Sequence, residues 1–311
     1  MEPLTEDNLR WLVSRFAHLK AEHGEAIGRP DLVLPTGEFF PDEFTLDPDG
    51  VHRVCKRLLS YAPVGADLPV GLGFLEEGEK ASGGGGCGTG ACGTGGGAGG
   101  GVSGGTVLET DDGYGITLAV SDTGNPVLMT TALARGVGAI VLSEAGEDAE
   151  PEMLGGLSEL TASAIGFGVL MTSGAYVYGK SCGGVRMRQA THLSLEEHAH
   201  LLALFCRVHD HKPGAARAHL ETTQKEAFEV ALAWVDSNPD IVQALREHPE
   251  TLADGVFQIA ETKGLLGRLF GKKPVAPEPI APKSKRPART EAEERRLAEA
   301  RALVEEALRT R

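Results

Sequence analysis

A glycine-rich tract separates the first 80 residues of this chain from the rest. Fifteen of the 23 residues from 83 to 105 are glycine, and most of the others are alanine, serine, threonine or cysteine. Glycine loses more backbone entropy than any other residue when it is ordered, and it has no side chain to bury. We therefore expect residues 81–106 to form a flexible insertion, with the packed parts of the fold on either side of it.

Apolar periodicity outside the tract predicts mostly helices. Apolar residues at helical spacing predict helices at residues 5–19, 51–59, 126–142, 195–208, 225–235 and 241–245. Short apolar or alternating runs predict strands at residues 32–34, 68–74 and 114–120. These elements predict a helix-rich α+β fold with a small sheet in the N-terminal half.

The composition changes again near the C-terminus. Residues 271–289 are rich in proline, lysine and alanine, which predicts a linker that follows a globular body over residues 1–262. Residues 290–311 predict an amphipathic helix, because Thr290 and Glu293 match a capping box. Its narrow apolar stripe consists of Leu297, Ala300, Val304, Ala307 and Leu308.

The charge is uneven along the chain. The net charge of the 311 residues is -14, whereas residues 272–311 hold eleven Lys/Arg and seven Asp/Glu, so the rest carries -18. An acidic body disfavours nucleic acids and anionic membranes as partners. No secretory signal follows Met1, no apolar run reaches the length of a membrane span, and the five cysteines are irregularly spaced. We therefore expect a cytoplasmic protein with reduced thiols.

Three segments together resemble a known family. Residues 32–42 read LVLPTGEFFPD, residues 166–169 read GFGV, and Glu159 precedes the latter. This combination, spread over residues 32–245, resembles bacterial zincin-like, metallopeptidase-like proteins whose biological role is unassigned. Members have an LPT-x-EFFPD loop, a His-Glu-x-x-His helix, and an apolar helix with a GLGV core and an acidic residue upstream. The resemblance implies a zincin-like body, in which residues 193–205 match the helix that follows.

The chain departs from this family at the decisive positions. A zincin needs two histidines one helical turn apart and a glutamate beside the first. Arg135, Gly136 and Ala139 stand at these three positions, and none of them can ligate zinc or act as a base. The resemblance therefore implies a pseudoenzyme, an interaction or scaffold protein that keeps Glu159 as a vestigial ligand. The alternative is that residues 130–140 are simply a buried helix with no relation to the family.

A second hypothesis is a metal-dependent hydrolase with a relocated site. Six of the ten histidines lie between residues 192 and 219, and a cysteine pair lies in the glycine tract. Besides Glu159, the candidate ligands are Cys87, Cys92, His198, His200, His209 and His211. The spacing argues against a shared site, since side chains two residues apart on a helix face different directions. Exposed or capping histidines without a cofactor are the simpler interpretation, with zinc as the alternative.

Two C-terminal segments are candidate sites for a protein partner. Residues 263–273 read KGLLGRLFGKK, a short apolar and basic run. Such a run can fit a partner groove, touch a membrane surface, or simply end the domain. The predicted helix at 290–311 can dock onto a partner or back onto the acidic body.

Overall fold

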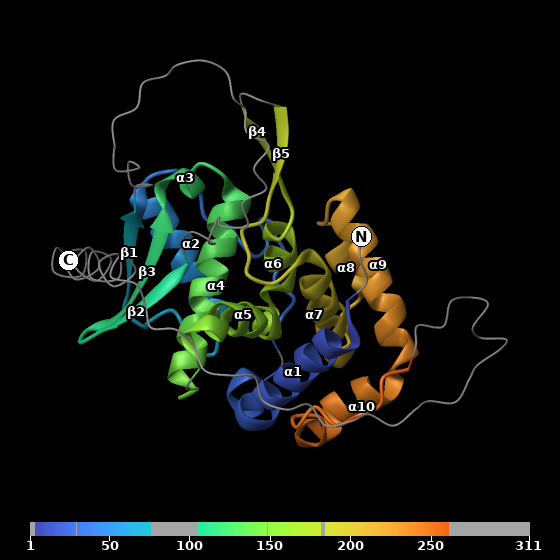
Figure 1. Ribbon diagram of the computed structural model, residues 1–311. Coiled ribbons are helices and arrows are strands. Elements are labelled where there is room, and N and C mark those ends of the chain that lie inside the picture. Colours follow the sequence, from blue (N-terminus) through green and yellow to red (C-terminus); the bar gives the residue numbers. More distant parts are fainter. Residues whose placement is uncertain (1–3, 29, 76–104, 148, 182–183, 261–311) are drawn as a thin grey trace, which may run out of the picture.

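The computed structural model describes residues 4–28, 30–75, 105–147, 149–181 and 184–260. Most of the predicted glycine-rich insertion lies outside these residues, as do the segment 263–273, the linker 271–289 and the helix 290–311. The described chain is a helix-rich α+β fold with a small sheet in its N-terminal half, which confirms the predicted class (Figure 1).

The first two helices begin at the caps that their sequences provide. Helix α1 (Glu6–Ile27) starts after Thr5, whose hydroxyl accepts a hydrogen bond from the amide of Asn8. Helix α2 (Pro48–Tyr61) starts after Asp47, whose carboxylate accepts from the amide of Gly50. Both helices bury one apolar face, as their periodicity predicts.

The sheet has three strands in the order β1-β3-β2. Strand β1 (Val70–Leu75) pairs in parallel with β3 (Gly113–Ala119), and β2 (Thr106–Thr110) pairs antiparallel with the other side of β3. The predicted strand at residues 32–34 is wrong, because this segment is irregular and joins no sheet. It is held instead by the Val33 amide, which donates to the carbonyl of Gly166 at 3.0 Å.

Helix α4 (Pro126–Glu144) lies between the sheet and the helices that follow α4 in the chain (Figure 1). The short α3 (Val120–Thr123) leads into it, and α5 (Pro151–Ala162) packs along it. A Cβ on Gly138 would lie 2.2 Å from the Ser158 carbonyl oxygen, so the two helix backbones touch there. Helix α5 ends in a kink at Ser163–Phe167, where Gly166 has a non-helical φ of +105°, and α6 (Gly168–Gly174) follows.

The C-terminal half is helical apart from one hairpin. That hairpin, β4 (Val177–Ser181) and β5 (Gly184–Arg188), has no counterpart among the predicted strands. Helix α7 (Leu195–Val208) begins with a capping box between Ser194 and Glu197. The remaining elements are α8 (Pro213–Arg217), α9 (Thr222–Ser237), α10 (Pro239–Glu247) and a 3-10 turn (Pro249–Thr251).

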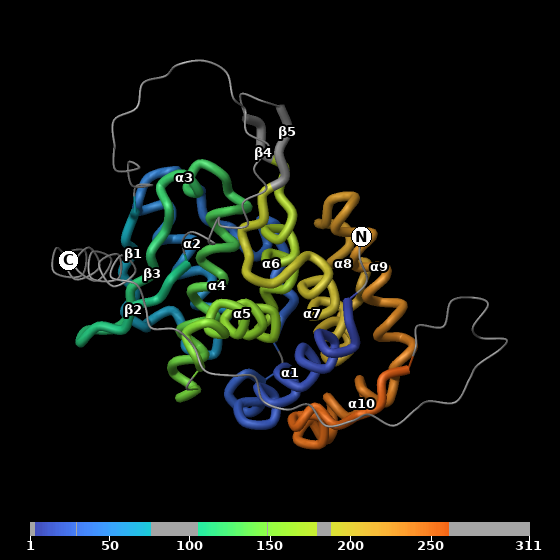
Figure 2. The backbone as a smooth tube through the Cα atoms, in the orientation of Figure 1, coloured from blue at the N-terminus to red at the C-terminus, as the bar shows by residue number. Residues whose placement is uncertain are grey.

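Two apolar clusters form the core. One joins α1, α7 and α9, and the other joins α2, the sheet and α4. Figure 2 shows these two groups of elements on opposite sides of the molecule. Residues 126–144 and 151–174 are long and apolar enough to span a membrane by composition. In each, 78% of the apolar window is buried inside the fold, as in the core helices of a soluble protein, so the composition is weak evidence for a span.

Gly166 provides a test of this packing, because its φ is +105° and an added Cβ would lie 2.0 Å from the Asp31 carbonyl oxygen. Gly146 has a similar φ of +73° but nothing within 4 Å of such a Cβ. We expect Gly146→Ala to lose about 1–2 kcal/mol of unfolding free energy through the left-handed conformation alone. Gly166→Ala should lose about 1–3 kcal/mol more through overpacking. Urea unfolding measures both, and equal losses would contradict the close contact.

Candidate functional site

A buried carboxylate lies where α4, α5 and α7 meet. The side chain of Glu159 on α5 is fully buried, and Arg135 on α4 is 2% exposed. The Arg135 Nη1 lies 3.1 Å from Glu159 Oε1 and also donates to the Ala190 carbonyl at 2.8 Å. Gly136 and Ala139, the neighbouring motif positions, take no polar part. The backbone of Gly136 lies against Ile116 of β3, and Ala139 is half-buried.

The loop before α7 supplies most of the other donors. The backbone amides of His192 and Leu193 donate to the carboxylate of Glu159 at 2.8 and 2.9 Å. The His192 Nδ1 lies 3.0 Å from the same carboxylate, whereas the His198 Nε2 lies 3.3 Å from it without the alignment of a hydrogen bond. One side chain therefore joins α4, α5, α7 and the loop between β5 and α7.

This environment keeps Glu159 ionised. Burial alone would raise the pKa of the Glu159 carboxyl, because it penalises the charged form. The contacts with His192 and His198 and the positive charge of Arg135 lower that pKa by more, so it lies well below its usual range. A buried carboxylate that is fully ionised and bonded on both oxygens is unavailable as a proton acceptor for a substrate. The cluster therefore holds the helices together.

The other predicted histidine ligands lie at separate places. His200 is buried, its Nδ1 lies 2.7 Å from the Glu196 carbonyl oxygen, and burial lowers the pKa of its imidazole. His209 and His211 lie against Phe205 at the end of α7, remote from Glu159 in the chain. Within the described ranges, no three His, Cys, Asp or Glu side chains form a group that could hold a metal ion. Cys87 and Cys92 lie outside the described residues.

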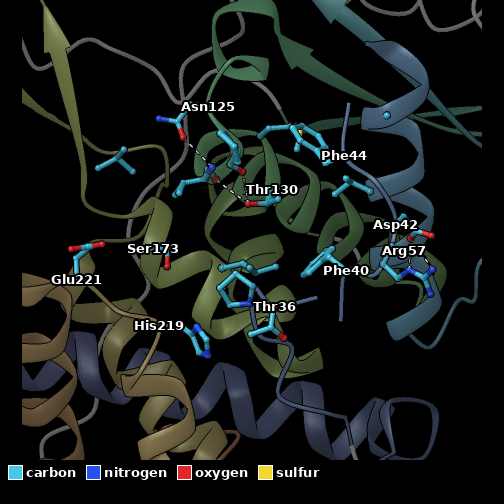
Figure 3. Close-up of a pocket in the computed structure, with 18 of the residues that line it drawn as sticks. Thr36, Phe40, Asp42, Phe44, Arg57, Asn125, Thr130, Ser173, His219 and Glu221 are labelled. Atoms are coloured by element: carbon cyan, nitrogen blue, oxygen red, sulfur yellow. Dashed lines mark hydrogen bonds and ion pairs between the residues drawn. The ribbon is translucent and has the colours of Figure 1, made fainter. Parts of the chain in front are cut away.

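The candidate binding site is a large apolar pocket, which none of the residues around Glu159 lines. It has a volume of about 660 Å³ and opens between α2, α4, α6 and the start of α9. Its apolar lining comes from separate segments: Pro35, Phe40, Phe44, Val54, Pro126, Val127, Met129, Leu170, Val177 and Tyr178. Figure 3 shows Phe40 and Phe44 on one side of the pocket and Ser173, His219 and Glu221 on the other.

Several of these apolar side chains are unusually exposed. Phe44, Val127 and Tyr178 are 38%, 37% and 56% exposed, although all three are large and apolar or aromatic. Exposed apolar side chains that gather around a concave surface mark binding sites on folded proteins. The polar atoms of this pocket therefore determine what kind of ligand it can take.

Charged side chains line the pocket beside the apolar ones. Three carboxylates (Asp42, Glu43 and Glu221) stand against two guanidinium groups. Arg57 is paired with Asp42 at 2.7 Å, and Arg53 donates to the hydroxyl of Thr45. Glu43 and Glu221 form no ion pair with any residue that the structure describes. Carboxylates without a cation therefore remain at the pocket.

Two further groups define the walls of the pocket. The Asn125 side chain, labelled in Figure 3, caps α4, because it accepts hydrogen bonds from the amides of Val127 and Leu128. The Gln224 amide donates to the carbonyls of Ser173 and Tyr176, which fixes the start of α9 against the end of α6. In contrast, the buried Thr36 hydroxyl oxygen has no hydrogen-bond partner among the described atoms.

The sequence singled out part of this pocket for another reason and did not predict a binding site there. The segment LVLPTGEFFPD, which carries the family resemblance, contributes Pro35, Thr36, Phe40 and Asp42 to the pocket. The exposed pocket residues on α4 and the β4–β5 hairpin could not be predicted from the sequence, because apolar residues in such segments are typical of a buried core. The contact between Arg135 and Glu159 joins two residues that the same resemblance singled out.

Comparison with known proteins identifies no relative for this chain: no family, curated protein or solved structure matched it. The zincin-like resemblance therefore stays a prediction, and the function must be argued from the site itself.

Replacement of Glu159 tests the role of the buried cluster. Glu159→Gln should reduce the unfolding free energy at pH 7 by about 3–5 kcal/mol, because it leaves Arg135 buried without its counter-charge. The lowered pKa means that Glu159 stabilises the fold above the pKa of an unfolded carboxyl, about 4.3, and that this contribution is lost as the pH falls below it. The difference between wild type and variant should therefore shrink in acid, as measured by urea unfolding.

Two variants serve as controls for that experiment. Glu226→Gln makes the same change at an exposed position of α9 and should shift stability by less than about 0.5 kcal/mol. The double variant Arg135→Met with Glu159→Gln removes both charges, whereas the amide oxygen of the introduced glutamine can still accept from the backbone amides of His192 and Leu193, so this variant should recover much of the lost stability. A small loss in Glu159→Gln that does not vary with pH would contradict the cluster's role.

Proposed function

We propose that this protein is a non-catalytic binding module whose apolar pocket takes up an apolar segment of a polypeptide with basic flanks. The observation that carries the proposal is the pocket itself. It combines a volume of about 660 Å³ with large apolar side chains that stay exposed at its edges. The same proposal includes a cytoplasmic location and no membrane partner, because the acidic body repels anionic surfaces.

The polar lining favours a polypeptide over a lipid. An anionic lipid or fatty acid needs a cation that is not already engaged, whereas Arg57 is paired with Asp42 and Arg53 donates to the Glu43 carbonyl and the Thr45 hydroxyl. The carboxylates of Glu43 and Glu221 favour lysine or arginine instead.

The buried cluster supports the non-catalytic part of the proposal. The positions that a zincin uses for metal and base hold Arg135, Gly136 and Ala139, and Glu159 is fully engaged by its donors. The alternative hydrolase would need ligands from several separate places. His198, His200 and His211 face different partners within the described fold.

A charge placed at the edge of the pocket should abolish binding of an apolar probe. Val127 stands in the first turn of α4, where a negative charge is favourable for the helix, so Val127→Glu should fold normally. We expect the neutral dye Nile red to bind wild type at one saturable site, and its affinity to fall at least about tenfold in the variant, because the carboxylate is desolvated by the dye. Fluorescence titration measures this change.

Val120→Glu is the matched control for that titration. Val120 is 44% exposed at the start of α3 and does not line the pocket. It should leave Nile red binding unchanged. Equal affinity for the dye in Val127→Glu and wild type would place the apolar site elsewhere and contradict the proposal.

Peptide competition tests the polypeptide specificity. A decapeptide of alternating leucine and lysine should displace Nile red from wild type, because its basic groups meet the acidic lining. The same peptide with glutamate in place of lysine should displace it at least about tenfold less well. Comparable competition by both peptides would contradict the predicted preference for basic flanks.

Elemental analysis tests the loss of metal. The full-length protein, free of tags and dialysed, should contain far less than one transition-metal ion per chain, because its motif positions lack ligands. About one zinc per chain would contradict a non-catalytic module. The Cys87→Ser and Cys92→Ser variants would then show whether the glycine tract holds the metal.

A further inference from the structure

The described chain ends close to one end of α9. The amide of Ala260 donates to the Asn238 side chain at 2.7 Å, and Asn238 follows directly after α9. Gln224, at the opposite end of the same helix, lines the pocket. The length of α9, which is labelled in Figure 1, therefore separates the last described residue from the pocket.

The length of the following chain matches this separation. Fourteen residues from Gln224 to Asn238 span about 21 Å at 1.5 Å per residue. An extended chain covers at most about 3.3–3.6 Å per residue, so Leu266 can lie about 20 Å from Ala260 and Phe270 about 33–36 Å from it. The apolar run that contains these two residues can therefore reach the pocket.

The chemistry of this run complements the pocket. Residues 263–273 hold no acidic residue, and their apolar side chains are Leu265, Leu266, Leu269 and Phe270. Their basic residues are Lys263, Arg268, Lys272 and Lys273. The pocket offers apolar walls together with Glu43 and Glu221, whose carboxylates have no cation among the described residues.

We propose that residues 263–273 occupy this pocket in the same chain, so that the protein covers its own partner site. The proposal rests on the proposed function, since it names the segment that the pocket binds. An external polypeptide must then displace this segment. The apparent association constant of that polypeptide is the intrinsic one multiplied by the fraction of time that the pocket is uncovered. Binding of a partner is thereby regulated by the chain's own C-terminal region.

Photo-crosslinking of the full-length chain tests the contact directly. The photoreactive residue p-benzoylphenylalanine replaces Tyr178, which is aromatic, 56% exposed and part of the pocket. Irradiation at low micromolar concentration should link position 178 to a peptide from residues 263–273 of the same chain, as identified by mass spectrometry. The same replacement at Leu154, which is 41% exposed on α5 and outside the pocket, should give no such link. Links mainly to residues 290–311, links between two chains, or none at all would overturn the proposal.

Nile red binding provides the second, independent readout. Coverage for about nine-tenths of the time reduces the apparent affinity of the dye about tenfold, so Leu266→Asp with Phe270→Asp should restore about that factor. Val304→Asp with Leu308→Asp makes the same chemical change in the predicted terminal helix and should leave the affinity unchanged. An unchanged affinity in the first variant, with dye binding still sensitive to Val127→Glu, would overturn self-coverage but leave the proposed function standing. Dye binding that is insensitive to Val127→Glu would contradict the proposed function itself.

Discussion

The ion pair between Glu159 and Arg135 is the constraint on which the rest of this fold depends. A buried ion pair is tolerated only when the remaining hydrogen-bond donors and acceptors of both side chains also have partners. Here the backbone amides of His192 and Leu193 and the carbonyl of Ala190 meet that requirement. The loop that follows the β4–β5 hairpin therefore lies against α4 and α5, where Leu193 also packs into the apolar core.

The pocket is a consequence of this placement. The amide of Ala190 also donates to the Gly174 carbonyl, which ties the same loop to the end of α6. Tyr176 and Tyr178 follow directly and form one wall of the pocket. The opposite wall is the segment at residues 32–42, anchored where the Val33 amide bonds Gly166 and where the Tyr61 hydroxyl bonds the Phe39 carbonyl. One wall is irregular chain, the other leads from irregular chain into β4, and both are held by polar contacts.

The sequence predicted those parts of the fold that local interactions decide. The helices at residues 126–142 and 195–208 were found because apolar spacing and the Ser194 cap are encoded within a few neighbouring residues. The segment 32–34 has a strand-like run but no strand to pair with, and pairing is not local information. The hairpin at 177–188 was missed for the converse reason: its glycines and charged residues hide a strand that exists through its pairing.

Prediction of the site was limited in the same way. The resemblance drew attention to Arg135 and Glu159 individually, yet it described one as a lost ligand and the other as a surviving one. Their contact spans 24 positions along the chain, and neither residue type signals burial. The pocket residues come from segments that each resemble ordinary core, and only the packed fold leaves Phe44, Val127 and Tyr178 exposed around one concavity.

In the proposed docking, the uneven charge of the chain contributes to the binding of residues 263–273. Residues 1–262 carry a net charge of -20, because residues 263–271 hold two basic residues and residues 272–311 carry +4. This body attracts a basic segment over the range of a Debye length, about 8 Å at physiological ionic strength, but exposed carboxylates and lysines alone bind weakly. Burial of leucine and phenylalanine side chains supplies the larger, salt-insensitive contribution. The apolar walls therefore determine how tightly a segment is held, while Glu43 and Glu221 determine which segments are selected. A chain that carries such a segment a short distance beyond Ala260 provides it at a high effective concentration, so any external partner must bind the pocket more strongly to replace it.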